Sequence, residues 1–174
     1  MRHGHSQTNP MPDALLVISD REPLAWLLQE QRFAIPAARM NSAPVPGSRL
    51  FLYTTRGCYR NPTKGRGLVM GVAVVQDQAR LLKEPMHFRG RDFAAGFSVR
   101  IQGLAPPHEG VELAPLAGRL DALPDPASWS VRLRRSLVPL SQRDATTIQR
   151  RLGPLIRPLP DVLTSYITAC RVGM

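Results

Sequence analysis

Residues 47–75 read Gly-Ser-Arg-Leu-Phe-Leu-Tyr-Thr-Thr-Arg-Gly-Cys-Tyr-Arg-Asn-Pro-Thr-Lys-Gly-Arg-Gly-Leu-Val-Met-Gly-Val-Ala-Val-Val. The apolar runs within residues 49–55 and 67–76 predict two strands. The long loop between them carries basic, aromatic, amide and glycine residues. Because two buried strands would hold both ends of this loop, its side chains are presented on a rigid frame. We therefore expect a binding site in this part of the chain.

The rest of the chain predicts helices and strands in a mixed order. Apolar runs indicate further strands at residues 14–18, 93–102 and 130–140. Helices are expected where Ser19 is followed by Glu22 and Ser141 by Asp144, because this spacing is typical of a helix N-terminus. Irregular, proline-rich segments are expected at residues 33–46 and 105–128. This order favours a compact α+β domain with a small curved or closed sheet.

A length of 174 residues favours one domain. We expect a disordered arm at residues 1–12, the domain at residues 13–153, and a C-terminal extension at residues 154–174 that docks on the sheet. No run reaches the ~18 apolar residues of a membrane span, and residues 1–12 lack the apolar centre of a signal peptide. We therefore expect a cytoplasmic protein without a membrane partner.

The charge of the chain favours a phosphate-rich partner. The net charge is +10, and the sequence pI is about 11.1. Residues 51–103 hold nine Arg or Lys and three acidic residues, which gives this segment a net charge of +6. A GC-rich genome would explain the preference for Arg over Lys, but it would not explain the excess of positive charge. Nucleic acid is thus the expected partner, with an acidic protein as an open alternative.

Catalytic patterns are weak in this sequence. It contains no H-x-E, C-x-x-C or G-x-x-x-x-G-K-[ST] pattern. Asp20, Glu22, Cys58 and His87 would have to converge in the fold to form a catalytic centre. An enzyme acting on a nucleotide or a small metabolite is therefore the less favoured alternative. We expect no cofactor and no metal.

Four segments in this order resemble the EVE domain of the PUA-like superfamily, which is related to YTH and ASCH domains. They are residues 16–23, residues 47–55, residues 67–73, and residues 136–141 with the helix that follows. The resemblance covers roughly residues 13–153. Ser48 departs from the family pattern, where an acidic residue is usual, and the loop after Thr55 is unusually long. The resemblance implies a small PUA-like β-barrel with flanking helices, and a pocket beside the strand that ends in Thr54 and Thr55.

The relatives implied by this resemblance are associated with nucleic acids, and several grip one modified base in an aromatic cage. We accordingly expect a non-catalytic reader of a modified base, flipped into an aromatic-lined pocket, with 5-methylcytosine in DNA as the first candidate. A reader of a modified base in RNA or tRNA is the alternative. The candidate base-pocket residues are Ser19, Trp26, Tyr53, Thr54, Thr55, Arg56, Tyr59, Asn61 and Trp129. The candidate phosphate-binding residues are Arg60, Lys64, Arg66, Arg89 and Arg91.

Several of these residues also have a purely structural interpretation. Tyr53 is expected to be half core and half pocket wall. Trp129 is as well explained by closing the bottom of the barrel as by lining the pocket. Strand alternation places only one of Thr54 and Thr55 inside. Asn61, which precedes a proline, is also typical of a simple turn.

Overall fold

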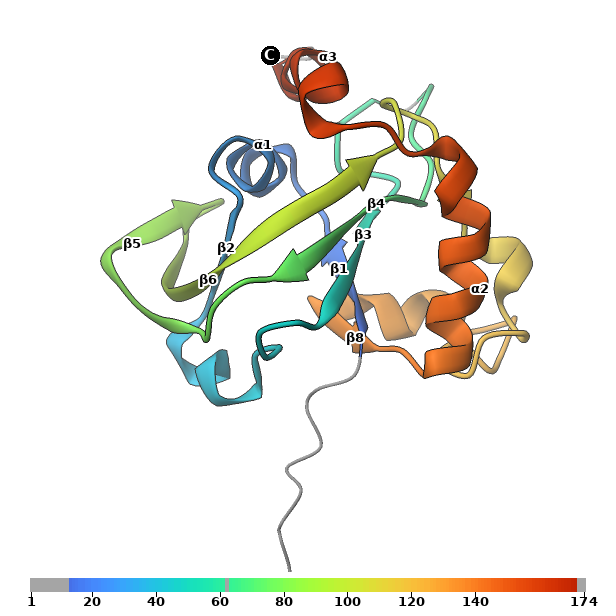
Figure 1. Ribbon diagram of the computed structural model, residues 1–174, viewed down its shortest axis with the longest axis horizontal. Helices are drawn as coiled ribbons and strands as arrows, with labels where there is room; N and C mark the ends of the chain where they lie inside the picture. Colours follow the sequence, from blue (N-terminus) through green and yellow to red (C-terminus); the bar gives the residue numbers. More distant parts are fainter. Residues whose placement is uncertain (1–12, 62, 172–174) are drawn as a thin grey trace, which may run out of the picture.

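The computed structural model describes residues 13–61 and 63–171, so the arm predicted at residues 1–12 lies outside the described residues. A curled sheet runs through the middle of the molecule, with helices on both of its faces (Figure 1). The strands are β1 (Ala14–Ile18), β2 (Arg32–Ile35), β3 (Arg49–Thr54), β4 (Leu68–Val75), β5 (Arg80–Phe88), β6 (Arg91–Leu104), β7 (Val111–Glu112) and β8 (Leu137–Pro139). The α-helices are α1 (Arg21–Glu30), α2 (Gln142–Leu152) and α3 (Leu159–Arg171). Short 3₁₀ helices cover Ala37–Ser42, Ala114–Leu116, Trp129–Arg134 and Gly153–Leu155.

The sheet is an open half-barrel. Its hydrogen-bonded path runs β2-β6-β4-β3-β1-β8, while β5 pairs with β6 and β7 pairs with β4. The neighbouring pairs are antiparallel except for β1 and β3, which are parallel. The predicted α+β class, with a small curved sheet and flanking helices, is confirmed.

Strand alternation divides the apolar residues between the two faces of the sheet. Leu16 and Leu52 join one core, which α1 and α3 cover with Leu24, Leu27, Leu28, Val162 and Tyr166. Leu15 and Phe51, one residue earlier in each strand, join the other core, which α2 covers with Ala145, Ile148 and Leu152. Because both faces are covered, successive residues within the central strands are apolar, as in Leu50–Tyr53 of β3, rather than every second one.

The N-terminus of α1 differs from the sequence prediction. Asp20, rather than Ser19, is the capping residue, and its Oδ1 accepts a hydrogen bond from the Glu22 backbone N–H at 3.3 Å. The backbone of Asp20 is extended, with φ −142° and ψ 143°, as a capping residue requires. Ser19 is left exposed between β1 and the cap. The second predicted cap is confirmed, since Ser141 Oγ accepts from the Asp144 N–H at 3.0 Å.

Two further segments differ from the prediction because tertiary pairing decides them. Residues 33–46 were expected to be irregular, but they contain most of β2, whose Phe33 pairs with Phe97 of β6. Residues 130–140 were expected to form one strand, but they begin as a 3₁₀ helix and only Leu137–Pro139 pairs with β1. Pro139 is tolerated there because β8 ends the hydrogen-bonded path of the sheet.

None of the helices among the described residues has the length and apolar character that a bilayer span needs.

A buried carboxylate ties α2 to the segment before it. Asp144 is 1% exposed, and its two oxygens accept from the backbone N–H groups of Asp121 at 2.8 Å and Ala122 at 2.9 Å. These bonds hold the turn at residues 121–122 against the first turn of α2.

We predict that Asp144→Ala lowers the free energy of unfolding by about 1–3 kcal/mol, because two partly buried N–H donors lose their acceptor. Urea denaturation followed by circular dichroism measures this change. The control is Glu84→Ala on the exposed side of β5, which should leave the midpoint unchanged. Equal midpoints for the two variants would contradict a structural role for Asp144.

Candidate functional site

The loop between β3 and β4, residues 55–67, is compact, and we call it the ridge. Asn61 Oδ1 accepts from the Thr63 N–H and the Lys64 N–H, each at 3.2 Å, and from the Thr63 hydroxyl at 2.8 Å. Gly65 lies so close to the opposite side of the loop that a Cβ there would be 2.4 Å from the Arg56 carbonyl oxygen. The loop is therefore closed on itself, and only glycine fits at residue 65 without moving the backbone.

One cleft lies on the β7 side of this ridge and has a volume of about 620 Å³. We call it the tryptophan cleft. Its walls come from the end of β3, the ridge, β7 and the 3₁₀ helices at Ala114–Leu116 and Trp129–Arg134. The lining residues are Tyr53, Thr55, Arg56, Gly65, Arg66, Gly67, Glu112, Ala114, Trp129, Ser130 and Leu133.

Aromatic and charged groups share this cleft. Tyr53 is 3% exposed, and its hydroxyl lies so close to Gly67 that a Cβ at residue 67 would be 2.0 Å away from it. Burial raises the pKa of Tyr53 to about 12, so the phenol is neutral and can donate a hydrogen bond. Trp129 is half-buried and packs against the α2-side core. Arg66 Nη1 lies 3.7 Å from Glu112 Oε1 in an exposed ion pair, which contributes little to stability and leaves both groups accessible.

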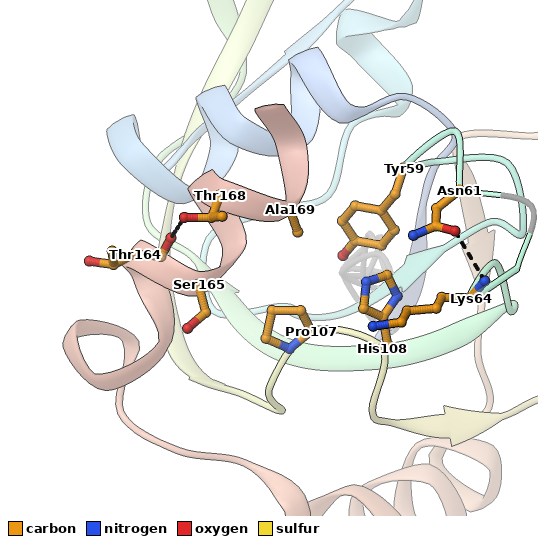
Figure 2. Close-up of a pocket in the computed structure, with 9 residues that line it drawn as sticks. All are labelled: Tyr59, Asn61, Lys64, Pro107, His108, Thr164, Ser165, Thr168 and Ala169. Atoms are coloured by element: carbon orange, nitrogen blue, oxygen red, sulfur yellow. Dashed lines mark hydrogen bonds between the residues drawn. The ribbon is translucent and has the colours of Figure 1, made fainter. Parts of the chain in front are cut away.

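A second cleft of about 440 Å³ lies on the other side of the ridge, against α3. We call it the α3 cleft, and Figure 2 shows its lining. The residues are Tyr59, Asn61, Lys64, Pro107, His108, Thr164, Ser165, Thr168 and Ala169.

The α3 cleft combines polar and apolar groups and carries little charge. The His108 ring lies 5.2 Å from the Tyr59 ring, centroid to centroid. Burial lowers the pKa of His108, and the nearby Lys64 charge lowers it further, so the imidazole is neutral at pH 7. Tyr59 is only 6% exposed, and its side chain hydrogen-bonds Thr54, itself 2% exposed. Tyr59 thus forms the floor of the cleft more than an open stacking face.

Asp20 connects the ridge to the β5–β6 turn. Its Oδ2 lies 2.8 Å from Arg89 Nε and 3.8 Å from Arg60 Nη2, and its side chain is 5% exposed. Both contacts are ion pairs, and within the described residues Oδ2 receives no hydrogen bond of good geometry. Arg60 and Arg89 are both in the left-handed backbone region, at φ 53° and 51°. The carboxylate therefore draws two arginines from separate turns towards the N-terminus of α1.

The predicted site residues divide among several places. The tryptophan cleft gathers Tyr53, Thr55, Arg56, Arg66 and Trp129, and the α3 cleft gathers Tyr59, Asn61 and Lys64. Trp26 lines neither cleft: its ring lies 6.0 Å from the Phe88 ring, with the Arg32 guanidinium 5.6 Å from its centroid. Ser19, Thr54, Arg60, Arg89 and Arg91 are also absent from both linings.

Sequence reasoning missed several lining residues. Glu112 falls in a segment expected to be a mere connection, and only its pairing with Leu68 of β4 brings it to the tryptophan cleft. Ser130 and Leu133 were expected in a strand. His108 and the α3 residues reach the second cleft through packing between segments distant in sequence, for which the sequence carries no local signal.

The cysteines are placed for packing rather than chemistry. Cys58 is fully buried and Cys170 is 9% exposed. Burial raises the pKa of both thiols, that of Cys170 to about 11, so neither is a thiolate at neutral pH. His87 lies elsewhere, on the exposed β5–β6 hairpin, where it pairs with Asp92. Within residues 13–61 and 63–171, no group of three or more His, Cys, Asp or Glu side chains is arranged to hold a metal ion.

We predict that Cys58 and Cys170 of the folded protein react slowly with iodoacetamide at pH 7, and that both react readily after unfolding in urea. Mass spectrometry of the labelled protein over time measures this difference. Fast labelling of Cys58 in the folded protein would instead support a nucleophilic role for this residue.

Comparisons with known proteins concern the fold. No family model matches this sequence, and none of the curated proteins does. Among solved structures, the Mmi1 YTH domain in complex with RNA matches with a TM-score of 0.51 and 8% identity, over 83% of this chain and 80% of that one. A hypothetical protein from Leishmania major matches with a TM-score of 0.51 and 16% identity, over 80% of this chain and 93% of that one. The fold of this chain is therefore similar to that of a YTH domain.

Proposed function

We propose that this chain is a non-catalytic nucleic-acid-binding module that holds one base in the tryptophan cleft. The proposal rests on one observation: the half-buried Trp129 ring and the exposed Arg56 and Arg66 side chains line a single cavity of about 620 Å³, together with the buried Tyr53. Aromatic rings stack on bases of any sequence, and arginine forks bind phosphates and base edges. A net charge of +10 supports a polyanionic partner.

Within this proposal, cytosine and 5-methylcytosine are the first candidates. The Glu112 carboxylate offers an acceptor for the N4 amino group of cytosine. Leu133 offers apolar contact to a methyl group at C5. A buried methyl contributes only on the order of 1 kcal/mol, so strong selectivity for the methylated base requires that water enters when the methyl is missing.

Single-stranded or locally unpaired nucleic acid is the favoured form of the ligand. Extracting a base from a duplex costs on the order of a few kcal/mol. Stacking on an aromatic side chain returns about 1–3 kcal/mol for each base. In a duplex, the cost of extracting the base nearly cancels the stacking energy. An unpaired base has no such cost, so most of the stacking energy contributes to binding.

RNA is the second candidate ligand, because the Mmi1 YTH domain, which shares the fold, was solved in complex with RNA.

We also propose membership of the EVE family, on the strength of the segments at residues 16–23, 47–55, 67–73 and 136–141. Beyond the clefts, Arg60, Arg89 and Arg91 are proposed to contact phosphates. Ser19 and Thr54 line neither cleft, and Trp26 packs on Phe88, so these three residues are not proposed to contact the base.

Equilibrium binding at physiological salt tests this proposal. The probes are matched single-stranded and duplex DNA and single-stranded RNA, each with cytosine or 5-methylcytosine at one position. A preference of tenfold or more for a methylated probe, equal to about 1.4 kcal/mol, supports a base-reading cleft. Equal affinity for all probes, with strong salt dependence, would leave only a basic surface.

We predict that Trp129→Ala weakens binding of the preferred probe at least fivefold, because it removes a stacking surface worth about 1–3 kcal/mol. Trp26→Ala is the matched control, since Trp26 is also half-buried but lines neither cleft. Thermal unfolding of both variants, and Trp129→Phe as a milder substitution, separate lost stacking from lost packing. Equal weakening by the two alanine variants would contradict the proposed cleft.

We further predict that Arg56→Ala and Arg66→Ala each reduce the slope of log affinity against log salt by about 0.7–0.9, the contribution of one phosphate contact. The control is Arg150→Ala, on the exposed side of α2 and in neither cleft. A salt titration from about 50 to 200 mM covers the range in which such contacts are resolved. Unchanged slopes for Arg56→Ala and Arg66→Ala would show that these two arginines do not contact phosphates.

A further inference from the structure

The two clefts are both lined by the ridge. Lys64 lines the α3 cleft, while the next two residues, Gly65 and Arg66, line the tryptophan cleft. Consecutive Cα atoms are about 3.8 Å apart, so one short segment contributes to the lining of both clefts. Lys64 and Arg66, two residues apart, thus line different clefts.

The ridge is built to keep its shape. The Asn61 side-chain oxygen is fully engaged by Thr63 and Lys64, and Gly65 packs against the Arg56 and Asn61 carbonyl oxygens with no room for a side chain. A preformed ridge of this kind can keep two neighbouring groups of one ligand apart without first having to order itself.

The α3 cleft suits a nucleoside better than a phosphate cluster. Its single lysine supplies one cation. The Ser165 hydroxyl and the His108 ring nitrogen that is not hydrogen-bonded to the Lys64 backbone supply uncharged polar groups. Figure 2 shows Lys64 extending alongside His108, with Ser165 on the α3 side of the cleft. Thr168 is committed elsewhere, since its hydroxyl donates to the Thr164 carbonyl oxygen at 3.0 Å.

We infer that the α3 cleft receives the nucleotide adjacent to the one whose base occupies the tryptophan cleft, with the linking phosphate on the ridge between Lys64 and Arg66. This inference rests on the proposed function and adds a second subsite to it. Unpaired bases of a single strand are readily splayed to opposite sides, which is how many proteins read them. The smallest full ligand is then a dinucleotide.

Isothermal titration of the full chain with short probes tests this arrangement. The probes are 5-methyl-dCMP, a DNA dinucleotide that contains the same base, the same dinucleotide with an abasic second position, and the ribonucleotide forms of each. We expect the intact dinucleotide to bind at least tenfold more tightly than the mononucleotide, with the abasic form between them. Dinucleotide affinity no better than that of the mononucleotide would overturn the second subsite.

The chain offers a matched pair of variants, because Lys64 and Lys83 are its two lysines and both are exposed. Lys64→Ala should weaken the dinucleotide at least threefold, whereas Lys83→Ala should leave its affinity unchanged. Ser165→Leu, which fills the α3 cleft from an exposed helix position, should act on the dinucleotide alone. Equal effects of Lys64→Ala and Lys83→Ala would overturn the inference.

These outcomes separate the second subsite from the proposed function. If mononucleotide binding depends on Trp129 but the dinucleotide gains nothing, the base cleft stands and the second subsite falls. If mononucleotide binding is undiminished in Trp129→Ala but lost in Ser165→Leu, the α3 cleft binds the mononucleotide independently of the tryptophan cleft. The proposed base cleft and the dinucleotide arrangement would then both fall.

Discussion

The parallel pairing of β1 with β3 is the constraint on which the candidate site depends. Ile18 lies opposite Thr54, so the two strands end side by side, and the Thr55 N–H donates to the Ile18 carbonyl oxygen at 3.0 Å. An antiparallel pair would have sent the segments after these strands to opposite edges of the sheet. The parallel pair instead brings the N-terminus of α1 and the ridge to one edge. Asp20 meets Arg60 across this junction.

The Asp20 carboxylate shapes the charge pattern at that edge. A buried carboxylate is costly unless it is paired, and here the first turn of α1 and two arginines compensate its charge. Arg60 and Arg89 hold left-handed backbone conformations that non-glycine residues seldom adopt. Their charges are partly neutralised by Asp20. The cations that face the clefts without a buried carboxylate are therefore Arg56, Arg66 and Lys64, which lie on the ridge itself.

The sequence predicted those parts of the fold that local pattern controls. The central strands β3 and β4 could be identified because both faces are covered and their apolar runs are unbroken. The cap at Ser141 followed from spacing alone. The edge strand β2 and the short strand β8 could not be read in the same way, because each exists only through its partner, β6 or β1. Ser19 was a plausible cap, but the exact residue where β1 ends decides which side chain reaches the helix N–H groups.

The predicted site was a single pocket, whereas the ridge separates its residues into two clefts. Nothing in the order of residues 55–67 shows that Lys64 and Arg66 line different clefts, because this depends on how the loop closes through Asn61 and Gly65. The division matters for selectivity. A methyl group alone adds on the order of 1 kcal/mol, about a fivefold preference, to any single cleft. A second subsite raises the affinity for methylated and unmethylated ligands alike, so it strengthens binding without improving discrimination. Selectivity for a modified base would then rest on Tyr53, Glu112, Trp129 and Leu133, whereas the contacts of Lys64 and His108 would set how tightly the strand is held.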